Sequence, residues 1–373
     1  MKVLHLISGG DTGGAKTHII SLLKELKNYA DTKLVCFIND TFYADAKAEG
    51  INIEVMEQKR RSDMTIVKKL VDEINKGEYD ILHCHGARAN FVAYFLKKHI
   101  DIPMITTVHS DYLLDFKDSF YKNMIFTPLN KMALKKFDYY IAVTNSFKEM
   151  LVERGFKRDK IETVYNGIDM SAEVNYVPRD EFYKRYNIDP SNKFVTGIAA
   201  RLDKVKNHEM LIKAANEAIK INPELLFLIA GLGDEETNLK SMCNEYGIED
   251  NVKFLGFVND PYSFFNAIDV NTLTSVSESF PYVILEAAKM KTPTISTRVG
   301  GIYEVIEDGE NGYLVNSDDY KELSERILNL AADREKLNEF GEKIYEKVRD
   351  NFSTKNMAED QYNIYMDILN KWR

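Results

Sequence analysis

Two glutamates in residues 275–291, SVSESFPYVILEAAKMK, are close enough in sequence to reach one ligand. Glu278 follows a predicted strand in a loop, and Glu286 lies eight positions later on the first turns of a predicted helix. A carboxylate accepts hydrogen bonds from two neighbouring hydroxyls, as on a ribose or a hexose. Taken alone, two such acids are more often a solvated pair on a surface, so their chemistry depends on what surrounds them.

The start of the same helix offers a second kind of contact. Pro281 stands where the helix should begin, which is a favoured position for proline. The backbone N–H groups near Tyr282 and Val283 have no partners inside the helix. Because such groups attract anions, we expect them to suit a diphosphate.

Two cations follow another predicted strand in residues 197–207, GIAARLDKVKN. Arg201 and Lys206 at the carboxyl end of a strand could stabilise the charge that builds on a departing diphosphate. On its own, the segment would be better explained as a loop with two exposed cations.

A glycine-rich loop joins the first predicted strand to the first predicted helix, in residues 7–23. Its glycines, Gly9, Gly10, Gly13 and Gly14, would let backbone approach a ligand phosphate at the helix start. The spacing is neither that of a dinucleotide-binding fingerprint nor that of a Walker loop. The loop alone is therefore weak evidence for a phosphate site.

Two histidines, His83 and His85, are separated by one residue on a predicted strand, so both side chains point to the same face. Two imidazoles without a third ligand are more often packing or a pocket wall than a metal site. We predict no metal site here, although His85 could border a cleft.

Short apolar runs alternate with amphipathic stretches through two successive halves of the chain. Near-continuous apolar strands alternating with helices predict α/β domains with parallel sheets covered on both faces. The expected strands are 3–8, 33–38, 51–56, 80–85, 103–108 and 139–144 in the first half, and 194–200, 225–231, 252–256, 270–275, 293–298 and 313–315 in the second.

The halves predict two Rossmann-like domains, residues 1–166 and 167–353. The polar stretch 166–192 reads as a connection between them, and a final helix near 354–373 has an apolar stripe that should pack back on the first domain. Two such domains would face each other across a deep cleft at the carboxyl ends of their strands, where ligands of parallel sheets bind.

Composition narrows the class of protein further. The chain has 373 residues, a length that suits two domains, and three cysteines, which we interpret as free thiols in a cytoplasmic protein. No apolar run approaches the length of a membrane-spanning helix.

The net charge of −9 divides into +3 for residues 1–165 and −12 for the rest. This is either ordinary scatter or a sign that the first half meets an anionic acceptor or a membrane surface. No basic stripe with interleaved aromatics suggests nucleic acid.

Together and in this order, these segments resemble glycosyltransferase family 4, whose members have the GT-B fold. The shared features, which cover nearly the whole chain, are Gly13-Gly14, His109 in TTVHS, VYNGID (164–169), ARLDKVKN with Arg201 and Lys206, LIAGLGDEE, FLGFV, ESFPYVILEA (278–287) and VGGIYEVIEDGENGYLV.

The resemblance implies a role for each charged residue. Arg201 and Lys206 would hold the diphosphate of a nucleotide-sugar donor. Glu286 would bind the ribose hydroxyls, and Glu278 would contact the transferred sugar. His109 would touch that sugar near the reacting carbon.

The resemblance also implies donor contacts made largely by backbone. Gly13 and Gly14 would bring the first helix close to the phosphates, and the segment after residue 255 would line the base pocket. The remaining donor-binding positions are Gly256, Phe257, Val258, Phe280, Pro281, Tyr282, Val283, Gly300 and Gly301.

The expected activity is a retaining, metal-independent hexosyl transfer from a UDP-linked sugar, without a cofactor. The acceptor would be a glycan or a lipid-linked molecule in cell-surface polysaccharide or glycolipid synthesis, with possible contact of the first domain at the inner face of the membrane. Two alternatives remain open: a nucleotide-sugar epimerase, and an inactive nucleotide-sugar-binding subunit of a transferase complex.

Overall fold

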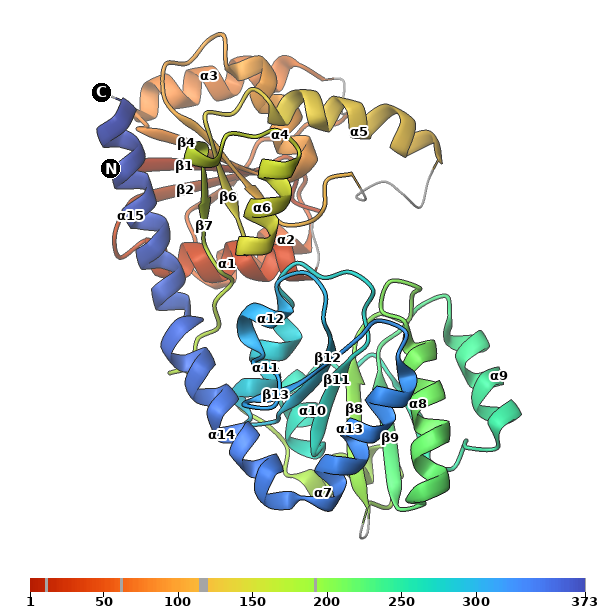
Figure 1. The fold of residues 1–373 in the computed structure, drawn as a ribbon. Coiled ribbons are helices and arrows are strands. Elements are labelled where there is room, and N and C mark those ends of the chain that lie inside the picture. The colour runs from red at the N-terminus through yellow and green to blue at the C-terminus, as the bar shows by residue number, and fades with distance from the viewer. Residues whose placement is uncertain (11–12, 61–62, 114–119, 191–192, 373) are drawn as a thin grey trace. The chain divides into compact units, whose positions relative to one another are not determined.

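The computed structural model describes residues 1–10, 13–60, 63–113, 120–190 and 193–372, and Figure 1 shows its helices and strands. The chain divides into two compact units, Met1–Asp169 with Ser353–Arg373 and Met170–Phe352. The boundaries lie within three residues of those expected from the sequence, at 166/167 and 353/354.

The described part of the first unit is a parallel sheet of order β3-β2-β1-β4-β5-β6-β7 between two layers of helices. Its strands are β1 (Lys2–Ile7), β2 (Asp31–Cys36), β3 (Ile53–Val55), β4 (Ile81–His85), β5 (Met104–Val108), β6 (Tyr139–Ala142) and β7 (Ile161–Thr163). Its α-helices are α1 (Gly14–Leu26), α2 (Thr41–Ala48), α3 (Thr65–Gly77), α4 (Gly86–Leu96), α5 (Phe120–Leu134), α6 (Asn145–Glu153) and α15 (Thr354–Trp372).

Strand β1 shows why the strands of this sheet are almost continuously apolar. Val3 and Ile7 pack with α1 and α15 on one face, whereas Leu4 and Leu6 pack with α3 and α4 on the other. Side chains alternate between the two faces of a strand. Because helices cover both faces of the sheet, the side chains on both faces of a strand must be apolar unless they have a hydrogen-bond partner.

The second unit repeats the arrangement, with parallel strands in the order β10-β9-β8-β11-β12-β13. Its strands are β8 (Phe194–Ala199), β9 (Leu225–Ala230), β10 (Val252–Gly256), β11 (Val270–Leu273), β12 (Thr294–Thr297) and β13 (Gly312–Val315). Its helices are α7 (Arg179–Arg185), α8 (His208–Ile221), α9 (Glu236–Tyr246), α10 (Pro261–Ala267), α11 (Tyr282–Lys289), α12 (Ile302–Val305), α13 (Tyr320–Ala332) and α14 (Arg334–Asn351).

In both sheets the strand order reverses beside the first strand, between β1 and β4 and between β8 and β11. Both orders therefore match the doubly wound arrangement of dinucleotide-binding domains, with β7 added at one edge of the first sheet.

The polar stretch 166–192 is not only a connection, contrary to the prediction. It contains α7, whose Phe182 and Tyr183 are fully buried in the second unit. The Tyr183 hydroxyl also donates a hydrogen bond to the carbonyl of Ala267. Two adjacent aromatic residues in a seven-residue helix give no helical period, so the sequence pattern could not show it.

A buried carboxylate ties α7 to the sheet of the second unit. Asp269, which precedes β11, accepts hydrogen bonds from the guanidinium groups of Arg179 and Arg334 and, at 2.6 Å, from the backbone N–H of Val195. Burial raises the pKa of Asp269, but these bonds outweigh burial and hold the pKa below its usual range.

The substitution Asp269→Asn should lower the free energy of unfolding by about 3 kcal/mol, because it removes the buried negative charge that pairs with two guanidinium groups. Because the pKa is depressed in the folded state, the contribution of Asp269 is present above the unfolded-state pKa and is lost as the pH falls through the folded-state value. Urea unfolding at several pH values should therefore show the two proteins converging below about pH 4. The control is Asp250→Asn, at a fully exposed aspartate 3.9 Å from Lys253. A deficit that persists undiminished at pH 3 would contradict the electrostatic explanation.

Candidate active site

The candidate site in the second unit begins at the point where the strand order reverses. Strands β8 and β11 are neighbours, and the loops 200–207 and 274–281 leave their carboxyl ends. The loops are joined directly, since the N–H of Val276 donates to the carbonyl of Val205 at 2.9 Å. Ligands of parallel sheets bind where such loops part.

Lys206 and Glu278, predicted from separate segments, lie in contact. The Nζ of Lys206 lies 2.5 Å from Oε1 of Glu278, and the hydroxyl of Ser275 donates to the same oxygen at 2.6 Å. Thr274 holds the backbone of Lys206, because its hydroxyl donates to the Lys206 carbonyl at 2.9 Å. The pair is largely buried, with 19% of the Lys206 side chain and 9% of the Glu278 side chain exposed. The Lys206 ammonium has three N–H donors, so it can bind a second acceptor besides Glu278.

Arg201 lies in the same loop but is not brought to this pair. Its side chain is 77% exposed, and its described partner is Asp203, at 3.1 Å. Asp203 also accepts a hydrogen bond from the backbone N–H of Lys206 at 3.0 Å, which fixes the turn between the two cations. Sequence reasoning missed Asp203, although an aspartate in a tight turn is a common acceptor for such backbone groups.

Gly300 and Gly301 support the backbone of the Glu278 loop. The N–H of Gly301 donates to the carbonyl of Ser279 at 2.9 Å. Gly300 has φ of +55°, and a Cβ there would lie 1.7 Å from the Glu278 carbonyl oxygen. No other residue fits this close approach, so these glycines position the loop.

The helix after this loop starts one residue later than predicted. It begins at Tyr282, and Pro281 is the capping residue with an extended ψ of 123°. Phe280 is buried against Phe352, with ring centroids 5.2 Å apart. Any contact of Phe280 with a donor therefore falls to its backbone.

Two polar groups on α11 have no hydrogen-bond partner among the described residues. The hydroxyl of Tyr282 is buried without a hydrogen bond, and the Glu286 carboxyl has no bond or ion pair with the described residues. Tyr282 and Glu286 are four residues apart and share a helix face, while Val283 packs partly into the core. Burial raises the pKa of Glu286 to about 7. A ligand with paired hydroxyls would satisfy this carboxyl.

Apolar side chains stand exposed beside Gly256, the last residue of β10. Gly256 has φ of +68°, and its carbonyl accepts a hydrogen bond from the N–H of Gly231 at 2.8 Å. Leu232 and Phe257 are 55% and 68% exposed, and Val258 is partly buried. Exposed apolar side chains at the carboxyl edge of a sheet suit the flat face of a base. The sequence motif LIAGLGDEE (228–236) contains Leu232 but did not indicate that its side chain lies exposed beside Gly256.

In the first unit, α1 begins at Gly14 with Gly13 as its capping residue. Gly13 has φ of +65°, and a Cβ there would meet no atom of the described, non-adjacent residues within 4 Å. The backbone conformation therefore favours glycine here, and no crowding requires it.

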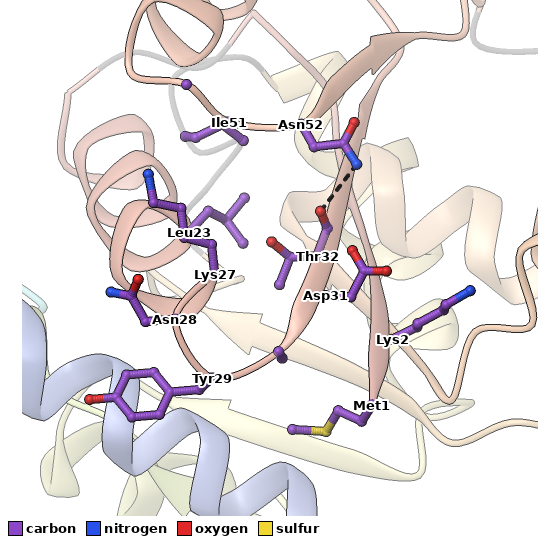
Figure 2. Close-up of a pocket in the computed structure, with 12 residues that line it drawn as sticks. Met1, Lys2, Leu23, Lys27, Asn28, Tyr29, Asp31, Thr32, Ile51 and Asn52 are labelled. Carbon is purple, nitrogen blue, oxygen red and sulfur yellow. Dashed lines mark hydrogen bonds between the residues drawn. The ribbon is translucent and has the colours of Figure 1, made fainter.

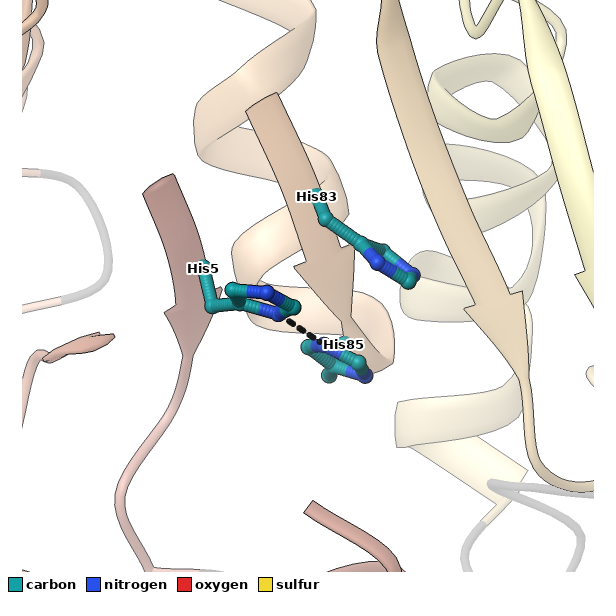
Figure 3. Close-up of side chains that lie close together, drawn as sticks. All are labelled: His5, His83 and His85. Carbon is teal, nitrogen blue, oxygen red and sulfur yellow. Dashed lines mark hydrogen bonds between the residues drawn. The ribbon is translucent and has the colours of Figure 1, made fainter. Parts of the chain in front are cut away.

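Histidines cluster on the face of the first unit's sheet that α1 and α15 cover. His5 on β1 pairs in register with His83 on β4, and Figure 3 shows their rings beside that of His85. His109 follows β5, and its Nε2 lies 3.3 Å from Nδ1 of His85. His18 on α1 contacts the ring of His109, with centroids 4.7 Å apart.

Further imidazoles therefore lie beside His83 and His85, which the sequence pattern did not predict, whereas the absence of a metal there stays a prediction. Ring nitrogens of His5, His83 and His85 lie within 4.8 Å of one another, as do those of His18, His85 and His109. The sequence could not show this, because the added histidines come from β1, α1 and the end of β5.

Two surface hollows are distinct from all these residues. One, of about 690 Å³, lies at the amino ends of β1 and β2 and is shown in Figure 2 with Lys2, Asp31 and Asn52 on its wall. The other, of about 300 Å³, lies between residues 307–311 and 343–351. Neither is lined by a predicted site residue. Among the described helices, none is long and apolar enough to cross a membrane.

Comparisons with known proteins match both halves of the chain. The family described as "Glycosyltransferase Family 4" matches residues 12–172, and "Glycosyl transferases group 1" matches residues 179–347. A relative from Bacillus anthracis, N-acetyl-alpha-D-glucosaminyl L-malate synthase, is 30% identical over 314 residues, covering 82% of this chain and 80% of the relative. The O-antigen biosynthesis glycosyltransferase WclY of Escherichia coli is 24% identical over 376 residues and covers 99% of each chain.

Solved structures share the fold. The Anabaena protein Alr3699/HepE in complex with UDP superimposes with a TM-score of 0.85 at 22% identity, over 98% of this chain and 100% of that chain. The complex of the same protein with UDP-glucose gives a TM-score of 0.83 at 23% identity, over 98% and 99%. The two doubly wound sheets and these matches agree, and the chain belongs to glycosyltransferase family 4, as an enzyme with the GT-B fold.

Proposed function

We propose that this glycosyltransferase takes its sugar from a UDP-linked donor and passes it, with retention of configuration, to a glycan or lipid-linked acceptor of cell-surface polysaccharide or glycolipid synthesis. The Lys206–Glu278 contact at the reversal of strand order carries the proposal. The names of similar proteins support the donor and the pathway: UDP-glucose is bound by Alr3699/HepE, and WclY is an O-antigen enzyme.

Lys206 would exchange its partner when the donor binds. Its ammonium would turn from Glu278 to the diphosphate, and the released Glu278 carboxylate would accept hydrogen bonds from sugar hydroxyls. The exposed Arg201 would reach the same diphosphate. Charge on the departing diphosphate grows as the glycosidic bond breaks, so these cations act most strongly on the transition state.

The nucleoside would occupy the neighbouring loops. Glu286 would accept hydrogen bonds from the two ribose hydroxyls, and these would satisfy a carboxyl that has no partner among the residues that the structure describes. Leu232 and Phe257 would cover the base.

The transfer step needs no metal or other cofactor in this proposal. The bond between the anomeric carbon and the phosphate oxygen breaks while the acceptor oxygen bonds to that carbon on the same face. The acceptor proton passes to the departing phosphate oxygen. His109 would contact the sugar near the reacting carbon.

The acceptor side is proposed to be the first unit, which would work in the cytoplasm or at the inner face of a membrane. Phe95, Met132 and Trp372 are exposed on α4, α5 and α15. Lys97 lies 5.3 Å from the ring of Trp372. Exposed apolar side chains beside lysines suit an anionic lipid surface.

The substitution Lys206→Ala should lower kcat by a factor of about 100 to 1,000, as removal of one donor to a developing anion typically does. Steady-state kinetics with donor and acceptor would measure this, with Lys204→Ala, at an exposed lysine of the same loop, as the control. The double variant Lys206→Ala, Glu278→Gln removes the unpaired carboxylate and separates lost folding from lost catalysis. Near-normal kcat in a folded Lys206→Ala enzyme would contradict the assigned role.

Binding of UDP-glucose should weaken about tenfold as the pH falls from 8 to 6. Since burial raises the pKa of Glu286 to about 7, the carboxyl is mostly protonated at pH 6 and then accepts fewer hydrogen bonds. Calorimetric titration across this range would measure the effect. Glu286→Gln should bind more weakly at pH 8 and lose most of the pH dependence. An unchanged slope in that variant would assign the titration to another group.

Full activity should remain in excess EDTA, because Arg201 and Lys206 supply the positive charge that a metal would otherwise provide. Proton NMR of the new linkage should show the anomeric configuration of the donor. Loss of activity that magnesium or manganese restores would contradict the metal-independent mechanism, and an inverted linkage would contradict the same-face displacement.

A further inference from the structure

Three imidazoles in the first unit form a continuous hydrogen-bonded row. Nδ1 of His5 lies 3.1 Å from Nε2 of His85, the link drawn in Figure 3. Nδ1 of His85 lies 3.3 Å from Nε2 of His109. Both links join a δ nitrogen to an ε nitrogen, so the row has a direction from β1 to the end of β5.

Counting protons restricts the row to two states. Burial, followed by the neighbouring histidines, lowers the pKa of His5 to about 3 and holds those of His85 and His109 well below the usual value. Each ring is therefore neutral near pH 7, with one N–H donor and one acceptor nitrogen. The donors must then all be Nδ1–H or all be Nε2–H, because any mixture leaves one link with two donors or two acceptors.

The free end of the row selects between these states. Nε2 of His5 is buried and has no hydrogen-bond partner in the part of the chain that the structure describes. If His5 donates from Nδ1, this nitrogen is a buried acceptor without a donor. In the opposite direction it is a buried N–H without an acceptor, which proteins tolerate less often.

We propose that His5 and His85 are positioning residues, which hold the imidazole of His109 through this row and fix it as the Nδ1–H tautomer. His109 then accepts at Nε2 from His85 and keeps one N–H, at Nδ1, to offer to a sugar hydroxyl. It acts as a hydrogen-bond donor in transfer and does not serve as a base. This consequence for transfer rests on the proposed function, whereas the tautomer does not.

The surrounding side chains restrain the row from both sides. His18 donates from Nδ1 to Oδ1 of Asn166 at 2.8 Å, and its ring meets that of His109 edge to face. Nε2 of His83 lies 2.8 Å from the Thr107 hydroxyl, and its Nδ1 is bonded to the Tyr365 hydroxyl. His83 thus makes two bonds outside the row and does not compete for its links.

The same rings have spacings that a metal could use, but the hydrogen bonds favour the row. A metal between Nδ1 of His85 and Nε2 of His109, the atoms that lie 3.3 Å apart, would need a lone pair at Nδ1 of His85. His85 would then donate from Nε2 to His5, which would leave the buried N–H of His5 without a partner among the described residues. We therefore assign no ion between His85 and His109.

Long-range proton–nitrogen NMR of the full-length protein, with its histidine side chains ¹⁵N-labelled and no substrate added, reports each tautomer directly. The expected result at pH 7 is the Nδ1–H form for His5, His85 and His109, each assigned through its own substitution. An Nε2–H form at any of the three would overturn the proposal.

A matched pair of variants at the far end of the row tests transmission to His109. His5→Leu removes the donor, whereas the amide of His5→Asn can replace it. The Nδ1–H signal of His109 should change to a mixture of tautomers in His5→Leu and return toward the wild type in His5→Asn. His99→Leu, at an exposed histidine outside the row, should leave it unchanged. An identical His109 tautomer in all variants would overturn the proposal.

Kinetic measurements on the same His5 variants separate the proposed tautomer from the proposed contact of His109 with the sugar. Loss of a supporting hydrogen bond to an active-site imidazole should lower kcat by about tenfold in His5→Leu, with donor KM little changed and partial recovery in His5→Asn. If the NMR result holds but kcat does not respond, the row stands and the contact of His109 with the sugar is wrong. If the wild type transfers no sugar, the NMR arm still decides the row.

Discussion

The reversal of strand order next to the first strand of each sheet is the constraint on which both candidate sites depend. In the second unit it sends the loops after β8 and β11 out of neighbouring strands, so Lys206 and Glu278 meet across 72 positions of sequence. In the first unit it makes β1 and β4 neighbours, so His5 lies beside His83 and His85. Neither contact follows from local sequence, because each depends on which strands pair.

Burial acts on these two sites with opposite signs. It raises the pKa of the Glu286 carboxyl toward neutrality, because it disfavours the anion. It lowers the pKa values of the histidines, because it disfavours their cations. The Glu286 carboxyl is therefore partly protonated, and hydroxyl donors from a ligand would favour its charged form. The histidine rings are neutral, so hydrogen bonds alone can set their tautomers.

The sequence predicted the order and type of nearly all strands because each is a short apolar run bounded by turn residues. The Arg201 and Lys206 loop and the Glu278 and Glu286 segment were predicted to follow strands, and each does, after β8 and β11. Short elements without a period were not found: α7 buries two adjacent aromatics, and β7 has only three residues.

The histidine row was missed for a different reason. Its members His5, His85 and His109 come from three separate segments, so a local pattern shows only His85 with its neighbour His83. Gly300 and Gly301 were predicted as donor-binding positions, and this stays a prediction; the structure adds that both lie against the backbone of Glu278 and Ser279. Motif spacing identified the two glycines, but the packing of the backbone decides what they touch.

The free protein keeps its candidate donor site in a charge-balanced state. A largely buried Lys206 without an anion would be costly, and Glu278 supplies that anion at 2.5 Å. A diphosphate can replace the carboxylate only if Glu278 finds other donors, and sugar hydroxyls are such donors. A nucleotide without its sugar would leave the carboxylate unsatisfied. Under the proposed function, the pair would therefore favour the complete donor over the spent nucleotide.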